Sequence, residues 1–176
     1  MTADQITALL DQADSARFDD DGGAPATLQG AVVDVPAGAP SGVGRLSWAP
    51  ARGQGSFDGA WWPRSWRLPS ELPPLIAALS TAGETIRRMS VNGDIWTDIP
   101  HWFTQPARPP VKVSWYRTLD PHTVTLSGGN RPRLVLLVIP PHTALETADE
   151  VRRIATAGRL VGPAGQILRH AGETSP

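Results

Sequence analysis

The chain has 176 residues, a formal net charge of −1 and no cysteine. A single domain of this length buries about two thirds of its unfolded surface, so it folds without covalent crosslinks. The absence of cysteine excludes disulfides, thiolate zinc sites and cysteine nucleophiles.

The charge is distributed unevenly along the chain. Residues 1–44 contain seven aspartates against one arginine, a balance of −6, whereas residues 45–176 contain fifteen basic and ten acidic side chains, a balance of +5. Fourteen of those fifteen basic residues are arginine. Two explanations of this bias stay open: a genome rich in G and C, which favours arginine over lysine, or recognition of phosphate by arginine. The sequence predicts an acidic, Gly/Pro-rich arm over residues 1–44, a domain over residues 45–158 and an extension over residues 159–176.

The acidic arm carries weak signals of secondary structure. Thr2 and Gln5 have the spacing of a capping box ahead of Ile6 and Leu9, which predicts a short helix over residues 3–13. Residues 28–35 predict one strand. We interpret the arm either as a solvated tail or as an autoinhibitory segment that lies on the basic domain, because opposite charges in one chain attract.

The sequence also predicts where the protein resides. The N-terminus is acidic and lacks the basic and then apolar pattern of a secretory signal. The longest apolar run, residues 134–139, is too short to cross a bilayer. We therefore expect a cytoplasmic protein without membrane association.

One amphipathic helix is predicted between residues 69 and 82. Leu72, Leu75, Ile76 and Leu79 recur at i, i+3, i+4 and i+7, which gives one apolar stripe that packs against a sheet. Three prolines, at positions 69, 73 and 74, are tolerated in a first turn, so the helix begins at residue 69 or 70, or as late as residue 73. Gly83 ends it in the left-handed conformation.

Alternating or continuous apolar segments predict strands over residues 46–48, 85–91, 94–99, 111–116, 122–127 and 133–139. Asn92-Gly93 predicts a hairpin between the second and third of these strands, because both residues accept positive φ. The unbroken apolar run of the last strand predicts burial on both faces. Thr143 and Glu146 predict a capping box before a helix that ends near Ala157, with a surface pair at i, i+4 between Asp149 and Arg153.

This order of elements predicts an α+β fold. We expect a mostly antiparallel sheet of about five to six strands with two main helices. The connections are too short for a doubly wound parallel fold.

The densest motif of the chain runs over residues 58–67, Asp-Gly-Ala-Trp-Trp-Pro-Arg-Ser-Trp-Arg. Trp61 and Trp62 are adjacent, so in an extended chain they point to opposite faces. Arg64 and Arg67 have the spacing to stack on these rings or on Trp66. Two interpretations stay open: a packed corner that clamps the helix to the sheet, or a ligand cleft with aromatic walls and an arginine for an anionic group.

The same motif carries a family resemblance. Residues 58–64, followed by Glu71-Leu72-Pro73, resemble the opening motif of the DUF5994 family, an uncharacterised actinobacterial family. Asn92, Asp94 and Trp96 resemble its second motif, residues 121–126 its third and residues 136–141 its last. The resemblance covers about residues 46–158 and implies a domain boundary and a lineage without a mechanism. The sequence departs from the family pattern at Val91 and Gly93, where the resemblance predicts a tyrosine and a bulkier residue.

Catalytic chemistry has one set of candidates. His122, at the start of a predicted strand, is the best general base, because an imidazole titrates near neutral pH. Asp58 and Asp94 form a carboxylate pair if their loops meet; otherwise each fixes a turn through its own backbone. The four histidines show no metal-binding spacing, so we expect no metal and no cofactor.

Together these patterns favour a non-catalytic domain that binds a small anionic or aromatic ligand. The candidate ligand-binding residues are Asp58, Trp61, Trp62, Arg64, Trp66, Asn92, Asp94, Trp96 and His122. Two alternatives stay open: a hydrolase-like enzyme with an Asp/His acid-base cleft, and a protein-interaction module regulated by the acidic arm. A protein partner or a homo-oligomer is compatible with the sequence. We expect no nucleic-acid partner, because a pI of about 6.4 indicates no overall basic field.

Overall fold

The computed structural model describes residues 45–174. The described residues belong to one compact unit. The predicted acidic arm, with its helix over residues 3–13 and its strand over residues 28–35, lies outside the described residues.

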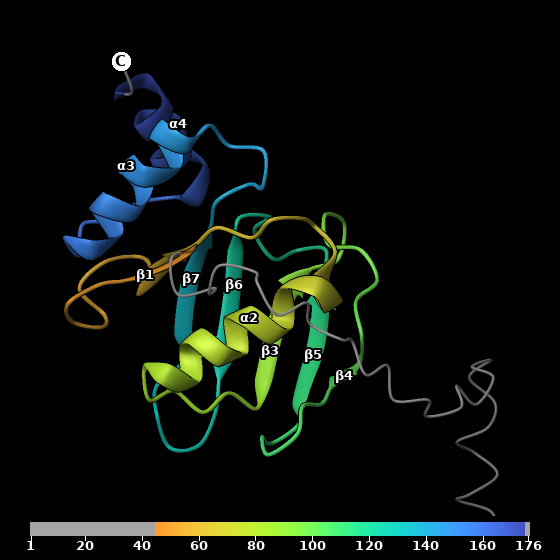
Figure 1. Ribbon diagram of the computed structural model, residues 1–176. Coiled ribbons are helices and arrows are strands. Elements are labelled where there is room, and N and C mark those ends of the chain that lie inside the picture. Colours follow the sequence, from red (N-terminus) through yellow and green to blue (C-terminus); the bar gives the residue numbers. More distant parts are fainter. Residues whose placement is uncertain (1–44, 175–176) are drawn as a thin grey trace, which may run out of the picture. The chain divides into compact units, whose positions relative to one another are not determined.

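Seven strands of the described part form one mixed sheet (Figure 1). The strands are β1 (Leu46–Trp48), β2 (Gly59–Trp61), β3 (Arg88–Asn92), β4 (Trp102–Phe103), β5 (Val111–Tyr116), β6 (Thr123–Ser127) and β7 (Leu134–Val138). Their order across the sheet is β1-β2-β7-β6-β3-β5-β4. The pairs β2–β7 and β3–β5 are parallel, and the other four are antiparallel.

Four strands, β2, β7, β3 and β5, therefore run in the same direction. Their last residues, Trp61, Val138, Asn92 and Tyr116, lie at one end of the sheet, which we call the carboxyl end. Because β6 runs against them, its first residues lie at this end as well. The topology thus gathers most of the motifs that the sequence singled out.

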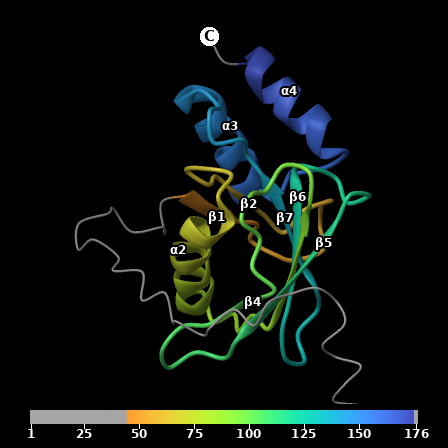
Figure 2. The same cartoon turned by 90° about the vertical axis from the view of Figure 1, so that its right-hand side faces the viewer.

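Helix α2 (Leu68–Thr81) covers one face of the sheet (Figure 2). Its predicted apolar stripe is buried, and Gly83, at φ +80°, follows its last turn, so both predictions are confirmed. The strand residues in the same apolar cluster are Leu46, Trp61, Met89, Val91, Val111, Val113, Val124, Leu126, Leu134, Leu136 and Val138. One continuous core thus joins α2 to strands β1, β2, β7, β6, β3 and β5.

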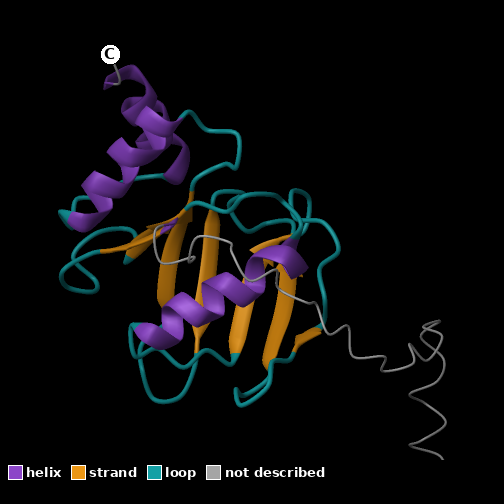
Figure 3. Cartoon of the chain, viewed as in Figure 1, coloured by secondary structure: helices purple, strands orange, loops and turns teal. Residues whose placement is uncertain are grey.

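Helices α3 (Leu145–Thr156) and α4 (Ala164–Thr174) pack on the opposite face, but only at one side of the sheet (Figure 3). This second apolar cluster contains Phe57, Ala60, Trp62, Leu137, Ile139, Ala148, Val151, Ala155, Leu160, Ala164, Ile167 and Ala171. Its strand residues belong to β2 and β7 or directly follow them. β7 is therefore buried on both faces, as its unbroken apolar run predicts.

The predicted fold class is right at the level of α+β and wrong in its details. The described residues contain three helices and a mixed seven-stranded sheet, rather than two helices and a mostly antiparallel sheet of five to six strands. The short strands β2 and β4 carry little periodic signal in two or three residues. α4 lies in the segment over residues 159–176 that was interpreted only as an extension.

The predicted hairpin at Asn92-Gly93 is wrong. β3 already has β5 on one side and β6 on the other, so no edge remains for a returning strand over residues 94–99. Asn92 instead turns the chain, because its Oδ1 accepts hydrogen bonds from the backbone N–H of Asp94 (2.8 Å) and Ile95 (3.3 Å). Only Thr97 of this segment forms a β-bridge, to Arg67.

Both helix starts also differ from the prediction. α2 begins at Leu68, so Pro73 and Pro74 lie inside the helix, where burial of the apolar stripe compensates for the missing N–H donors. α3 has Ala144 at its N-cap and no side-chain capping bond, so the predicted capping box is wrong.

The predicted surface pair of α3, Asp149 with Arg153, is wrong as well. Arg152 pairs with Asp149 (2.8 Å) and Arg153 pairs with Glu150 (2.6 Å), both at i, i+3. Spacings of three and four residues both bring helix side chains together, and the sequence does not discriminate between them. Over residues 45–174, no helix is long and apolar enough to span a membrane.

Candidate functional site

Trp61 anchors a packed aromatic corner at the carboxyl end of the sheet. Its ring stacks on Trp96, with centroids 5.2 Å apart and planes 8° apart. Trp66 meets Trp96 edge-on, with centroids 5.1 Å apart. The backbone reinforces this corner, because Thr97 donates its N–H to the carbonyl of Trp66 and accepts one from Leu68. These rings join the loop before α2 to the loop after β3.

Trp62 points to the opposite face of the sheet, as the alternation of an extended chain predicts. It belongs to the α3 and α4 cluster, and its Nε1 donates a hydrogen bond to the carbonyl of Pro140 (3.1 Å). Both tryptophans are buried, so neither ring faces solvent as a free binding platform. Trp61 packs in the core on the α2 face of the sheet, and Trp62 packs in the core on the opposite face.

Arg45 lies against Trp62. Its guanidinium carbon is 4.3 Å from the centroid of the indole, and its Nη1 donates to the carbonyls of Trp62 (3.4 Å) and Pro63 (3.3 Å). The backbone brings these residues together, because the N–H of Trp62 donates to the carbonyl of Arg45 at the end of the β1–β2 pair. Stacking and two hydrogen bonds of the guanidinium fix a cation beside the motif.

Glu71, in the first turn of α2, is a buried carboxylate that faces the same motif. Its two oxygens accept hydrogen bonds from the backbone N–H of Arg64 and of Ser65, both at 3.0 Å. The hydroxyl of Ser65 donates a third bond, also at 3.0 Å. Glu71 thus fixes the loop that carries Arg64, and its acceptor sites on the loop side are largely used.

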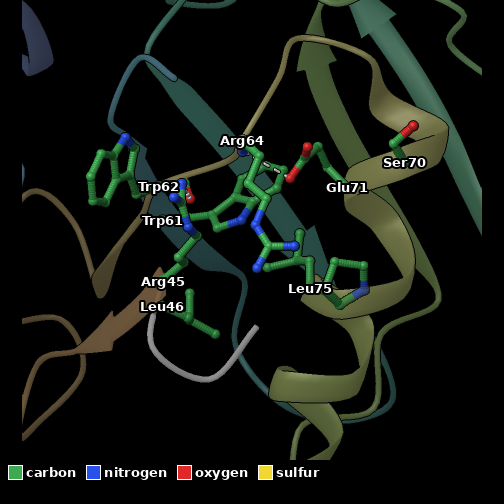
Figure 4. Close-up of a pocket in the computed structure, with 9 residues that line it drawn as sticks. Arg45, Leu46, Trp61, Trp62, Arg64, Ser70, Glu71 and Leu75 are labelled. Atoms are coloured by element: carbon green, nitrogen blue, oxygen red, sulfur yellow. Dashed lines mark hydrogen bonds between the residues drawn. The ribbon is translucent and has the colours of Figure 1, made fainter. Parts of the chain in front are cut away.

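A small cavity lies between these groups (Figure 4). Its volume is about 40 Å³, and it is lined by Arg45, Leu46, Trp61, Trp62, Arg64, Ser70, Glu71, Pro74 and Leu75. It lies between β1, the end of β2 and the first two turns of α2. Drug-sized ligands occupy pockets of about 300–1,000 Å³, so this cavity has room for a few water molecules or a small charged group.

Arg45 is affected by its burial and by the charges around the cavity. Burial of the guanidinium is the main reason that the pKa of Arg45 is lowered. The nearby charges of Arg64 and Arg152 lower it as well, while Glu71 acts in the opposite sense. Arginine remains protonated despite such a shift.

Residues 45–155 match the family of unknown function DUF5994. The chain belongs to the DUF5994 family. No curated protein and no solved structure matches the chain. The match begins at Arg45 and includes every residue that lines the cavity, whereas α4 follows it.

The remaining DUF5994 motif residues have structural partners. Asp58 accepts hydrogen bonds from the backbone N–H of Gly53 (3.0 Å) and of Val135 (2.9 Å), at the starts of β2 and β7. Asn92 donates its Nδ2 to the carbonyl of Leu119 (2.7 Å), which joins the ends of β3 and β5. Asp94 forms an exposed ion pair with Arg117 (3.2 Å).

His122 lies at the start of β6, where its backbone is held by Asp120 (2.8 Å) and by Val138 (2.7 Å). Its Nδ1 is buried and has no hydrogen-bond partner among the described residues, and the same is true of Nε1 of Trp96. The structure does not bring Asp58 to His122. Asp58 bonds to Val135 and His122 to Val138, three residues or roughly 10 Å further along β7, and they approach it from different neighbouring strands. No single acid-base cleft joins them.

Gly93, where the resemblance predicts a bulkier residue, lies close to Trp115. A Cβ added at Gly93 would lie 3.0 Å from Cδ1 of Trp115, so a bulkier side chain here requires that ring to move.

Of the predicted site residues, the structure places Trp61, Trp62 and Arg64 at the cavity. Trp66 and Trp96 belong to the packed corner behind it. Sequence reasoning missed Arg45 and treated Glu71 only as part of the family motif. Only the pairing of β1 with β2, across a ten-residue connection, brings Arg45 to Trp62, so no local pattern indicates it.

Proposed function

We propose that this DUF5994 domain binds a small anionic group, such as a carboxylate or a phosphate, in the cavity between Arg45 and Arg64. The observation that carries the proposal is the guanidinium of Arg45, which is held beside this cavity. Among the described residues, Arg45 and Arg64 line the cavity together with one carboxylate, and the oxygens of that carboxylate already accept three hydrogen bonds. A guanidinium binds carboxylates and phosphates through charge-assisted hydrogen bonds.

The fixed position of Arg45 supports the same proposal. Its guanidinium is held by Trp62 and by two carbonyls before any ligand arrives, so binding does not have to order this side chain. Leu46 and Leu75 supply an apolar wall beside the two cations. The size of the cavity favours a small ion, or the charged end of a larger molecule whose remainder lies outside.

The test compares two arginines of the same loop. Arg64 lines the cavity, whereas Arg67 does not and pairs with Asp98 (2.8 Å). Thermal unfolding of the wild type, Arg64→Ala and Arg67→Ala is measured with inorganic phosphate, acetate or chloride at constant ionic strength. An anion at ten times its Kd raises the free energy of unfolding by about 1.4 kcal/mol.

We expect phosphate or acetate to stabilise the wild type and Arg67→Ala but not Arg64→Ala. Native mass spectrometry of protein purified from its own host then identifies a co-purifying ligand, which Arg64→Ala loses and Arg67→Ala keeps. Equal stabilisation of all three proteins, or of none of them, would contradict the proposal and leave the motif as a packed corner.

A further inference from the structure

The sheet has a second feature, which is separate from the cavity. Strands β6, β3, β5 and β4 carry polar side chains on the face opposite α2. Paired residues point to the same side of a sheet, so the register of the strands defines this face. Its residues include Arg88, Ser90, Trp102, Lys112, Tyr116 and Thr125, and we call it the open face. No described helix covers it (Figure 2).

Cations cross the open face near one end of the strands. Arg88 and Lys112 are directly opposite each other in the parallel pair of β3 and β5. Arg133 immediately precedes β7 at the same end. All three are exposed, and none forms an ion pair with a carboxylate of residues 45–174. Like charges directly opposite each other destabilise a sheet, so this arrangement favours an external anion.

Two aromatic rings on the same face are exposed. Trp102 is 58% exposed and Tyr116 is 54% exposed. Trp102 is paired with Lys112, whose Nζ lies 6.0 Å from the centroid of the indole. Tyr116 is four residues further along β5, on the same side of the strand. The rings therefore flank a row of small polar side chains.

That row consists of Thr125, Ser90 and Ser114, which are side by side on β6, β3 and β5. All three are partly exposed and present hydroxyl groups. The strand residues of the open face include no carboxylate. Of the acidic residues just beyond these strands, Asp94 is paired with Arg117, and Asp120 accepts hydrogen bonds from His122 and Thr123.

We propose that the open face binds single-stranded nucleic acid. Exposed rings stack on bases, lysine and arginine contact phosphates, and hydroxyl groups bond to base edges or sugars. Adjacent strands are about 5 Å apart, so the cations form a stripe that crosses the sheet beside Trp102. The absence of a nucleic-acid partner was expected from the charge of the whole chain. The described residues alone carry a balance of +5, and those on the open face are basic or neutral.

An acidic protein segment is the competing partner. It would use the same cations, but it gains little from flat, exposed rings in a face without a groove. Stacking on aromatic rings therefore discriminates between the two classes.

The test uses the full-length protein and short fluorescein-labelled oligo(dT) and oligo(U), with binding followed by anisotropy over a series of salt concentrations. Trp102→Ala should weaken binding about fivefold to over a hundredfold, the usual effect of losing one stacked base. The double variant Arg88→Gln/Lys112→Gln should also weaken it and reduce the slope of log K against log salt by about 1.4, because each phosphate contact contributes about 0.7.

The matched control is Arg159→Gln/Arg169→Gln, which removes the same charge from exposed positions after α3 and on α4. It should keep the affinity and the salt slope of the wild type. No binding at low salt, or equal losses in the open-face and control variants, would overturn the proposal. A polyglutamate peptide that binds as tightly as the oligonucleotides, with Trp102→Ala without effect on either, would overturn it in favour of an acidic protein segment. None of these results depends on the anion cavity.

Discussion

The two faces of the sheet are built on different principles. On the α2 side, apolar residues from β1 to β5 form one cluster under a single helix. On the other side, α3 and α4 bury β2 and β7, and the neighbouring strands present hydroxyl groups, cations and rings. The α2 face therefore stabilises the domain across almost its whole width. The other face is divided between a smaller core and a polar surface that no described helix covers.

The largest loss of stability is expected for changes at two neighbouring leucines of β7. Leu136 and Leu137 have no exposed surface, and they point to the α2 core and to the α3 and α4 core, respectively. Each change to alanine should lower the free energy of unfolding by about 2–5 kcal/mol, because it removes buried methyl groups and leaves a cavity. Denaturant unfolding measures both. A loss below 1 kcal/mol for Leu137→Ala alone would show that the second core is loosely packed.

The next test concerns Glu71, which joins the first turn of α2 to the loop that carries Arg64. Glu71→Gln keeps the size of the side chain but replaces one acceptor oxygen with a donor. Since both oxygens bind backbone or hydroxyl donors of the loop, the variant should be destabilised by about 1–3 kcal/mol. Glu146→Gln, an exposed glutamate in the first turn of α3, is the matched control. Similar stability of both variants would contradict the role of Glu71 in fixing the loop.

A smaller effect is expected on the open face. Ser114 and Val113 are consecutive on β5, with the serine on the open face and the valine in the α2 core. Ser114→Ala should change the free energy of unfolding by no more than about 0.5 kcal/mol, as expected for a surface position. Val113→Ala provides the contrast and should be clearly destabilised. A large effect of Ser114→Ala would mean that the open face is a structural surface.

The smallest change in stability is expected for an ion pair on the surface of α3. There, the hydrogen bond from Arg153 lowers the pKa of Glu150. The folded-state pKa lies below the unfolded value, so the pair stabilises the protein above the ordinary pKa of a glutamate. This contribution is lost as the pH falls through the lowered folded-state pKa. The difference in Tm between the wild type and Glu150→Gln, measured by calorimetry, should be small at neutral pH and vanish in strong acid. A difference that grows on acidification would contradict this assignment.

Part of the candidate site was predictable from the sequence. The density of tryptophan and arginine over residues 58–67 directs attention to the correct corner, and the alternation of an extended chain correctly separates Trp61 from Trp62. Arg45 was not predictable, because its approach to Trp62 depends on the pairing of β1 with β2. Whether Asp58 and His122 share one cleft was not predictable for the same reason, since the positions of both along β7 depend on strand direction.

The sequence by itself determined the elements whose signals are local: the buried stripe of α2, the alternation of residues 111–114 in β5 and of β6, the continuous apolar run of β7 and the family membership. The alternation of β5 ends at Trp115, which is exposed although the pattern places it on the buried face. These depend on periodicity within a few residues, so burial follows from the pattern alone. Tertiary structure alone decided which strands are neighbours. Asn92-Gly93 is compatible with a hairpin or with an isolated turn. It forms an isolated turn because β5 and β6 pair with the two edges of β3. Strand pairing is a competition between distant segments for the same backbone hydrogen bonds, and no local sequence records its outcome.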